Sequence, residues 1–162
     1  MPLPRGKQSG INYGQKKQEG ASDTAQLIDI ANYLKTRYKI DAKREWYIIF
    51  NKETEKIERI LQSVKKSDLG IHEKNQDGYE EYTETSFARN PDILWIDKYG
   101  LWVLELDGAV HDRLVAKTNK RNELYKYNHI KLIVVNIADL KELKLNIYDF
   151  IDQRIEKLVN CS

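Results

Sequence analysis

Two strongly apolar runs, at residues 93–96 and 101–106, dominate the hydrophobic pattern of the chain. Both runs are rich in isoleucine, leucine, valine and tryptophan, and the polar segment between them contains Gly100. Apolar runs of this composition joined by a short glycine-containing turn predict a β-hairpin. A two-residue loop at Lys98 and Tyr99 would pair the runs along their whole length.

The register of this hairpin decides where three carboxylates lie. With the two-residue loop, Asp92 is directly across from Glu105, and Asp107 shares the face of Glu105 because side chains two residues apart point the same way. A three-residue loop with a bulge at Gly100 would break this register, since a slip of one residue moves every side chain to the other face. We prefer the two-residue loop because it gathers the acids. Ordinary strand-end acids facing solvent are the alternative.

Beyond the hairpin, apolar residues spaced three or four apart predict helices, and continuous apolar runs predict strands. The unbroken run at 130–136 indicates a strand buried on both faces. Ser22 or Asp23, and later Asp112, can cap helices because their short side-chain oxygens satisfy the N–H groups of a first turn. The predicted helices are about 23–38, 113–128 and 147–159, and the predicted strands outside the hairpin are 45–50 and 130–136.

The segment from 51 to 86 has a weaker pattern. Residues 51–66 have apolar positions at a helical period and predict a helix, with a charged hairpin turn at 51–60 as the alternative. Residues 67–86 are polar, with two glycines and repeated Glu and Tyr, and predict a long loop or an irregular hairpin. His72 lies alone in that segment, and we expect it at the surface.

The succession of predicted helices and strands indicates an α/β (α+β) fold. Composition indicates a globular chain, because 162 residues with 41% apolar and 32% charged residues can form one domain, at 21–162, with its own core. No apolar run approaches the roughly 20 residues that span a membrane. Residues 1–20 are polar and basic and predict a flexible arm, or simply a solvated tail. A single cysteine at Cys161 and no secretory leader pattern favour an intracellular, cytoplasmic setting.

Helix 113–128 carries cations on the side that faces inward. At about 100° per residue, Lys117 and Arg121 fall with Leu124 and Tyr125, and buried cations need partners, which the hairpin acids can supply. A structural ion pair, or side chains that reach solvent from buried stems, is the alternative. The net charge of +2 permits a nucleic-acid partner without requiring one. The cations that could follow phosphates, with tyrosines among them, are Arg113, Lys117, Lys120, Arg121, Lys126 and Lys131.

Pro91-Asp92 followed by Glu105-x-Asp107 resembles the active-site pattern of the PD-(D/E)XK nuclease superfamily. The longer string from Glu105 through Asp107 and Gly108 to His111, followed by a basic helix, is similar to the very-short-patch-repair-like endonuclease branch. The resemblance covers residues 88–137. It implies a restriction-endonuclease-like core, with a mixed central sheet of about four strands flanked by helices.

The resemblance also implies a metal-dependent DNA endonuclease, in restriction, repair or mobile-element processing, with Mg²⁺ (or Mn²⁺) bound by Asp92 and Glu105. The superfamily lysine, two residues after the second acid, is replaced here by Asp107, which could bind a second ion or orient His111. Lys117 is the candidate replacement lysine, and His111 could act as a base or as a ligand through water. The expected DNA-contacting residues are Lys120, Arg121, Arg113 and Lys126.

Two alternatives to an endonuclease stay open on sequence grounds. If no cation replaces the missing lysine, the fold could bind nucleic acid without cleaving it. The third functional class is a protein-interaction or structural domain whose acids lie at the surface and form no site. A homodimer would suit cleavage of both strands, and segment 67–86 is a place where DNA sequence could be read.

Overall fold

The computed structural model describes residues 21–108 and 112–161, and the side chains of 24–108 and 115–161. Within this part of the chain, contacts group the residues into two compact units. The first unit is Glu45–Asn90, and the second combines residues 21–44 with residues 91–161. The prediction of one domain over 21–162 stays a prediction, because units defined by contacts need not fold independently. The predicted arm at 1–20 lies outside the described residues.

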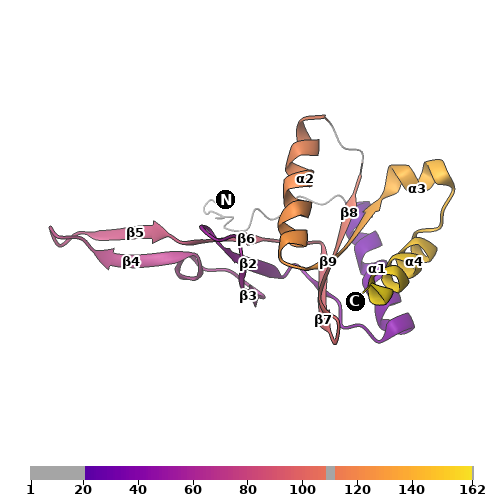
Figure 1. The fold of residues 1–162 in the computed structure, drawn as a ribbon, viewed down its shortest axis with the longest axis horizontal. Coiled ribbons are helices and arrows are strands. Elements are labelled where there is room, and N and C mark those ends of the chain that lie inside the picture. Colours follow the sequence, from indigo (N-terminus) through magenta and orange to yellow (C-terminus); the bar gives the residue numbers. More distant parts are fainter. Residues whose placement is uncertain (1–20, 109–111, 162) are drawn as a thin grey trace. The chain divides into compact units, whose positions relative to one another are not determined.

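The second unit is built on a four-stranded mixed sheet (Figure 1). Its strands are ordered β1 (Lys43–Arg44), β7 (Ile93–Asp97), β8 (Gly100–Asp107) and β9 (Lys131–Asn136). Only the β8–β9 pair is parallel; β1–β7 and β7–β8 are antiparallel. Four helices accompany the sheet, so the predicted α+β class with about four mixed strands and flanking helices is confirmed. The helices are α1 (Ala21–Tyr38), α2 (Asp112–Tyr127), α3 (Ile137–Leu143) and α4 (Ile147–Asn160).

The predicted hairpin register is confirmed. Asp97 pairs with Gly100 and Ile96 with Leu101, so the loop consists of Lys98 and Tyr99. Gly100 has φ +117°, a conformation that residues with a side chain rarely adopt. No bulge therefore shifts the register, and the face predicted to collect the acids is preserved.

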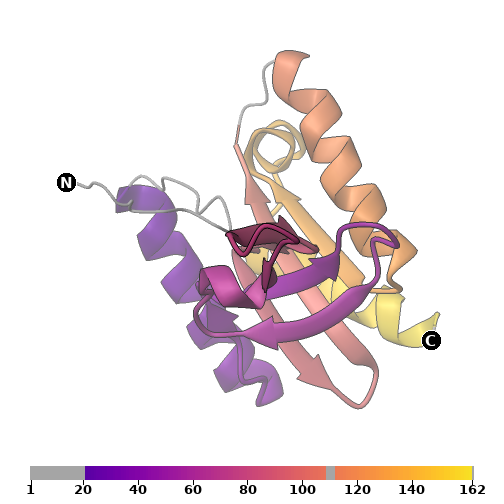
Figure 2. The same ribbon diagram turned by 90° about the vertical axis from the view of Figure 1, so that its left-hand side faces the viewer.

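The sheet has two covered faces. One face packs against α1, α3 and α4 in a core that includes Ile93, Trp95, Trp102, Leu104 and Ile133, and the indoles of Trp95 and Trp102 stack at 5.4 Å. The helix α2 covers the other face through its buried residues Leu124 and Tyr125. Figure 2 shows the strands between indigo α1 and orange α2. Because β9 contributes buried residues to both faces, the prediction of a strand buried on both sides is confirmed.

Helices α1 and α4 are also joined by a polar contact at the edge of the core. The hydroxyls of Tyr33 and Tyr38 both donate to the carboxylate of Asp152. Burial and the neighbouring carboxylate together raise the pKa of both phenols, so each hydroxyl keeps its proton and its hydrogen bond.

Two helix starts differ slightly from the predictions. The helix α1 begins at Ala21, so Ser22 and Asp23 lie inside it rather than before it. The helix α2 begins at Asp112 itself, one residue earlier than expected. A helix that the sequence analysis missed, α3, follows β9 directly, and the side chain of Asn136 accepts the Asp139 N–H at its first turn. None of the described helices is long and apolar enough to cross a membrane.

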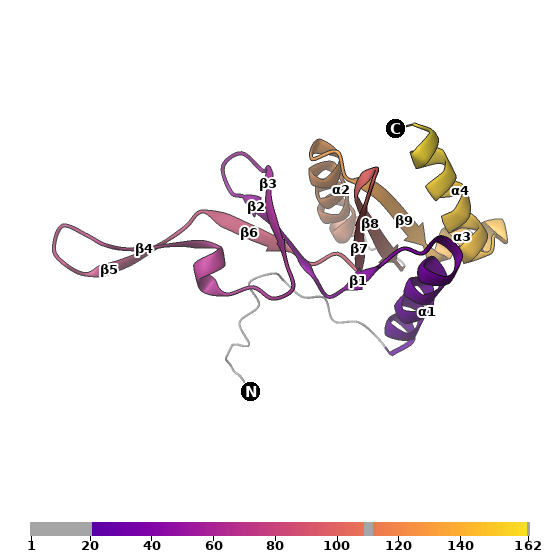
Figure 3. The ribbon, with the colours of Figure 1, turned by 90° about the horizontal axis from the view of Figure 1, so that it is seen from below.

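The first unit contains only strands and one short 3₁₀ turn. Its three-stranded antiparallel sheet has the order β3 (Ile57–Leu61), β2 (Tyr47–Asn51), β6 (Ser86–Arg89). The turn is η1 (Lys66–Asp68), and β4 (Gly70–Lys74) pairs with β5 (Glu80–Glu84) as a separate two-stranded ribbon (Figure 3). The irregular-hairpin alternative for residues 67–86 is therefore confirmed, and His72 is exposed as expected.

The predicted helix at 51–66 is wrong, and the hairpin alternative is the correct one. The side chain of Asn51 accepts the N–H groups of Glu53 and Thr54, which closes a turn immediately after β2. Glu55 has φ +60°, which a right-handed helix excludes. The apolar residues of β3 pair with β2 instead of lining one side of a helix.

Candidate functional site

Two buried carboxylates lie next to each other at one end of the β7–β8 hairpin. Asp92 immediately precedes β7 and is 8% exposed, and Glu105 in β8 is 1% exposed. The backbone N–H of Asp92 lies 3.4 Å from Oε1 of Glu105, and the N–H of Leu106 donates to Oδ2 of Asp92 at 2.7 Å. The hairpin register produces this geometry, because Asp92 continues the pairing of Ile93 with Leu104 by one residue. The convergence predicted for these two acids is present.

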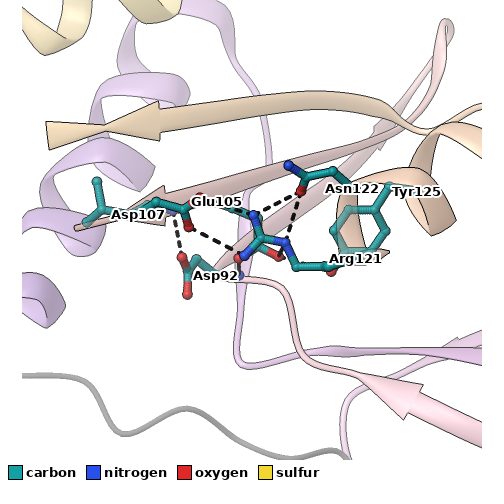
Figure 4. Close-up of polar contacts among 7 residues, drawn as sticks. Asp92, Glu105, Asp107, Arg121, Asn122 and Tyr125 are labelled. Atoms are coloured by element: carbon teal, nitrogen blue, oxygen red, sulfur yellow. Dashed lines mark hydrogen bonds and ion pairs between the residues drawn. The ribbon is translucent and has the colours of Figure 1, made fainter. Parts of the chain in front are cut away.

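The helix α2 contributes a tyrosine and an arginine to the same place (Figure 4). The hydroxyl of Tyr125 donates to Oε2 of Glu105 at 3.0 Å. The Nε of Arg121 lies 3.9 Å from the same oxygen. Tyr125 is itself 1% exposed, so this hydrogen bond is shielded from water and holds the Glu105 carboxylate in one orientation.

Asp107 binds the outer end of the same guanidinium. Nη1 and Nη2 of Arg121 reach Oδ1 and Oδ2 of Asp107 at 3.4 and 3.2 Å, a two-point contact that matches the planar fork of arginine. Oδ1 of Asn122 accepts from Nε at 3.1 Å and from Nη2 at 2.9 Å. The guanidinium is therefore held by three side chains, Glu105, Asp107 and Asn122, as the dashed lines in Figure 4 trace for its hydrogen bonds and ion pairs.

The electrostatics keep Arg121 charged. Burial on its own lowers the pKa of the guanidinium, and this is the largest single influence. The charge of Glu105 and the hydrogen bond and charge of Asp107 oppose burial, and together they raise the pKa above its usual value. The site thus contains a permanent cation against three carboxylates among its described side chains.

The predicted cations of α2 divide into two groups. Arg121 does turn toward the acids, with a side chain that is 15% exposed. Lys117, the candidate replacement lysine, is exposed, and so are Lys120 and Lys126. The inward placement predicted for Lys117 is wrong. Among the side chains of α2 that the structure describes (115–127), the buried ones, Leu124 and Tyr125, belong to its second half, whereas Val115 is 43% exposed.

Two predicted site residues cannot be placed. His111 lies outside the described residues, and the side chain of Arg113 does too. Conversely, sequence reasoning did not foresee the contacts of Asn122 and Tyr125. Tyr125 had been noted as an aromatic residue on the inner side of the helix, and its position four residues after Arg121 was the available signal, because residues four apart on a helix share a face.

The carboxylates of Asp92 and Glu105 are the candidate ligands for a metal ion at this site. Carboxylate oxygens at Asp92 and Glu105 are the ligand type that hard divalent cations such as Mg²⁺ prefer, so the donor chemistry fits. Within the described part of the chain, however, no group of three or more His, Cys, Asp or Glu side chains has a spacing that could hold a metal ion. Two of the three local carboxylates instead face the guanidinium of Arg121.

Comparison with known proteins adds no relative. No protein-family model, no curated protein and no solved structure matches this chain. The site is therefore interpreted from its own residues, their burial and their contacts.

Proposed function

We propose that this chain is a metal-dependent DNA endonuclease with a restriction-endonuclease-like core, as its resemblance to the PD-(D/E)XK pattern implies. The observation that carries the proposal is the buried pair of Asp92 and Glu105. Burying carboxylates costs several kcal/mol unless cations or hydrogen bonds compensate. Side-by-side acids at the end of a rigid hairpin are typical of a site that binds a cation for chemistry.

Asp92 and Glu105 are the residues that would hold Mg²⁺. When bound, the ion lowers the pKa of a coordinated water and offsets charge on the scissile phosphate. Tyr125 and the N–H of Leu106 orient the two carboxylates, because each donates to an oxygen of one of them. The exposed ammonium groups of Lys117, Lys120 and Lys126 are available to phosphates of the DNA backbone.

The alternative is a nuclease-like fold that binds DNA without cutting it. One observation favours this alternative: Asp107 stands where the superfamily has its lysine, and Arg121 pairs with Asp107. A guanidinium does not give up a proton at ordinary pH, so it cannot serve as a general acid or base. In the cleavage proposal, Lys117 or His111 would have to supply that role.

The decisive experiment is a cleavage assay on supercoiled plasmid and on labelled duplex and single-stranded DNA, in Mg²⁺, Mn²⁺ or EDTA. We expect metal-dependent nicking or linearisation by the unaltered chain. In Asp92→Asn and Glu105→Gln, the rate should fall by more than the roughly 10- to 100-fold that loss of an outer hydrogen-bond partner costs a metal site. The altered chains must give the circular dichroism spectrum of the unaltered chain.

Glu123→Gln is the matched control, because it makes the same chemical change at an exposed position of α2. Its cleavage rate should stay within about twofold of the unaltered rate, as for surface changes in general. Full activity in both site variants would refute the proposed site. Salt-sensitive DNA binding with no cleavage in any metal would establish the binding-only alternative.

A further inference from the structure

The guanidinium of Arg121 lies beside the carboxylate of Glu105, the same group that a bound metal ion would contact. Its Nε is 3.9 Å from Oε2 of Glu105, the same oxygen that accepts the Tyr125 hydroxyl. Glu105 is 1% exposed and the Arg121 side chain 15% exposed, so water screens this contact poorly. A second positive charge beside Glu105 would therefore repel the guanidinium of Arg121 strongly.

The Nε of Arg121 lies 3.9 Å from Oε2 of Glu105, whereas Nη1 and Nη2 contact Asp107. The contacts to Asp107 are shorter, 3.2 and 3.4 Å, and they use both carboxylate oxygens. The Asn122 amide oxygen adds two more hydrogen bonds to the guanidinium. Weakening the Glu105 contact would therefore leave Arg121 anchored at its other end.

Building on the proposed function, we propose that Arg121 is the internal counter-cation of Glu105 and competes with a divalent metal ion for that carboxylate. In the metal-free chain, Arg121 neutralises Glu105 and Asp107 together. Like charges close together repel, so a divalent ion at Glu105 and the guanidinium weaken each other there. Arg121 then stays tethered by Asp107 and Asn122, with its positive charge turned away from Glu105 and toward an incoming phosphate. This gives Asp107 a role, since it holds a helix-borne cation in place of the superfamily lysine.

If Arg121 competes with the metal ion for Glu105, removing Arg121 should change the metal affinity, which can be measured without DNA and without cleavage. In Arg121→Gln, removal of the competing charge should tighten Mn²⁺ binding by about tenfold or more, where tenfold corresponds to 1.4 kcal/mol. Mn²⁺ affinity would be measured by titration calorimetry and by the loss of the free-ion electron paramagnetic resonance signal. Glu105→Gln should abolish the same binding, which assigns the ion to this carboxylate.

Lys120→Gln is the matched control. It removes one positive charge from the adjacent position of α2, but Lys120 is exposed. Its Mn²⁺ affinity should stay within about twofold of the unaltered value, because water screens exposed charges. A change equal to that of Arg121→Gln would mean that only the overall charge matters, and it would overturn the competition.

Thermal unfolding gives a second readout. Without metal, Arg121→Gln should unfold at a lower temperature than the unaltered chain, since it leaves buried carboxylates without their counter-cation. At the same Mn²⁺ concentration, the ion should then raise its midpoint by more than it raises that of the unaltered chain, because the stabilisation by an ion that binds only the folded state grows with the logarithm of its affinity. If Arg121 formed only a structural ion pair, Arg121→Gln would unfold at a lower temperature, but Mn²⁺ would not raise its midpoint by more than that of the unaltered chain.

If Arg121→Gln does not fold, Asn122→Ala tests the same competition with every charge retained. It removes the hydrogen bonds of Asn122 to Nε and Nη2. Because Nε is the nitrogen that lies 3.9 Å from Glu105, the guanidinium is then held less firmly beside that carboxylate, and Mn²⁺ should again bind more tightly, although by a smaller factor. Unchanged or weaker binding in these variants, while the unaltered chain binds Mn²⁺, would overturn the inference and leave the endonuclease proposal intact. No Mn²⁺ binding in any form would overturn the inference and the metal role of Glu105 together.

Discussion

Two of the antiparallel hairpins, β7–β8 and β4–β5, have opposite surroundings. In β7–β8, the pairs of Ile93 with Leu104 and of Trp95 with Trp102 are buried on both strands. In the β4–β5 ribbon, no paired residue is buried, and Gly70 and Tyr82 alone are half-buried. The same backbone pairing thus serves as a core element in one unit and as a solvated ribbon in the other.

The acids of the two hairpins show what this difference means for function. The ribbon segment Gly70–Glu84 has five acids and one lysine, and all are exposed: Glu73, Lys74, Asp77, Glu80, Glu81 and Glu84. Water solvates those charges, so they need no partner. At the end of β7–β8, by contrast, Asp92 and Glu105 are buried and contact backbone N–H groups, Tyr125 and Arg121. Burial, rather than the number of acids, marks the site.

The ribbon is held by a few local contacts around Tyr82. Its ring lies 4.9 Å from that of His72, and the ammonium of Lys66 sits 4.4 Å above its centre. The hydroxyl of Tyr82 donates to the backbone oxygen of Lys66 at 3.0 Å. Because a two-stranded hairpin is marginal in water on its own, the contacts of Tyr82 with Lys66 in η1 add support to the pairing of the two strands.

The largest expected contrast comes from making one substitution in each hairpin. Ile93→Ala removes a fully buried side chain from β7 and should destabilise the fold by about 2–5 kcal/mol. Ile71→Ala in β4 makes the same chemical change at a residue that is 48% exposed, and should cost less than about 1 kcal/mol. Urea unfolding followed by circular dichroism measures both, and equal losses would show that the ribbon is buried in solution.

A smaller effect is expected from crowding the ribbon. At Gly70, an added Cβ would lie 2.4 Å from the backbone oxygen of Thr83 and 2.6 Å from the Tyr82 ring. Gly70→Ala should therefore cost about 1–3 kcal/mol, mostly as lost protection of ribbon amides in hydrogen exchange. Gly108→Ala is the control, since nothing lies within 4 Å of its added Cβ. Unaltered ribbon protection in Gly70→Ala would mean that the close approach to Tyr82 is absent.

The smallest effect on stability is expected from surface charge, where DNA binding is the readout. Glu80→Gln and Lys120→Gln each alter an exposed residue and should change stability by less than about 0.5 kcal/mol. If α2 follows the phosphates, Lys120→Gln lowers the slope of log affinity against log salt by about 1. Glu80→Gln should leave the slope unchanged. A ribbon that reads DNA would instead respond to Glu80→Gln, which would restore the earlier expectation that segment 67–86 sets specificity.

The sequence was most informative where apolar runs are long and the turn is short. For β7–β8, the turn residues leave a two-residue and a three-residue loop open, and the two-residue loop, preferred because it gathers the acids, is the one observed. The sequence was misleading at 51–66, where Ile57, Ile60 and Leu61 satisfy a helical period although β3 pairs with β2. Three apolar residues in a short run fit either period, and the turn chemistry of Asn51 decided between them.

By itself, the sequence predicted the mixed α+β class and the β7–β8 hairpin, because strand periodicity and turn signals are local properties. It left two registers open, and the observed one gathers Asp92, Glu105 and Asp107 on one face. Only the tertiary structure decided which cation meets those acids. Lys117 and Arg121 are one helical turn apart and equivalent on a helical wheel. The described buried residues of α2 lie in its second half, so Arg121, whose side chain is 15% exposed, contacts the carboxylates, whereas Lys117 is exposed. The sequence determines the position of each residue around the helix, but packing determines which turn of the helix contacts the sheet.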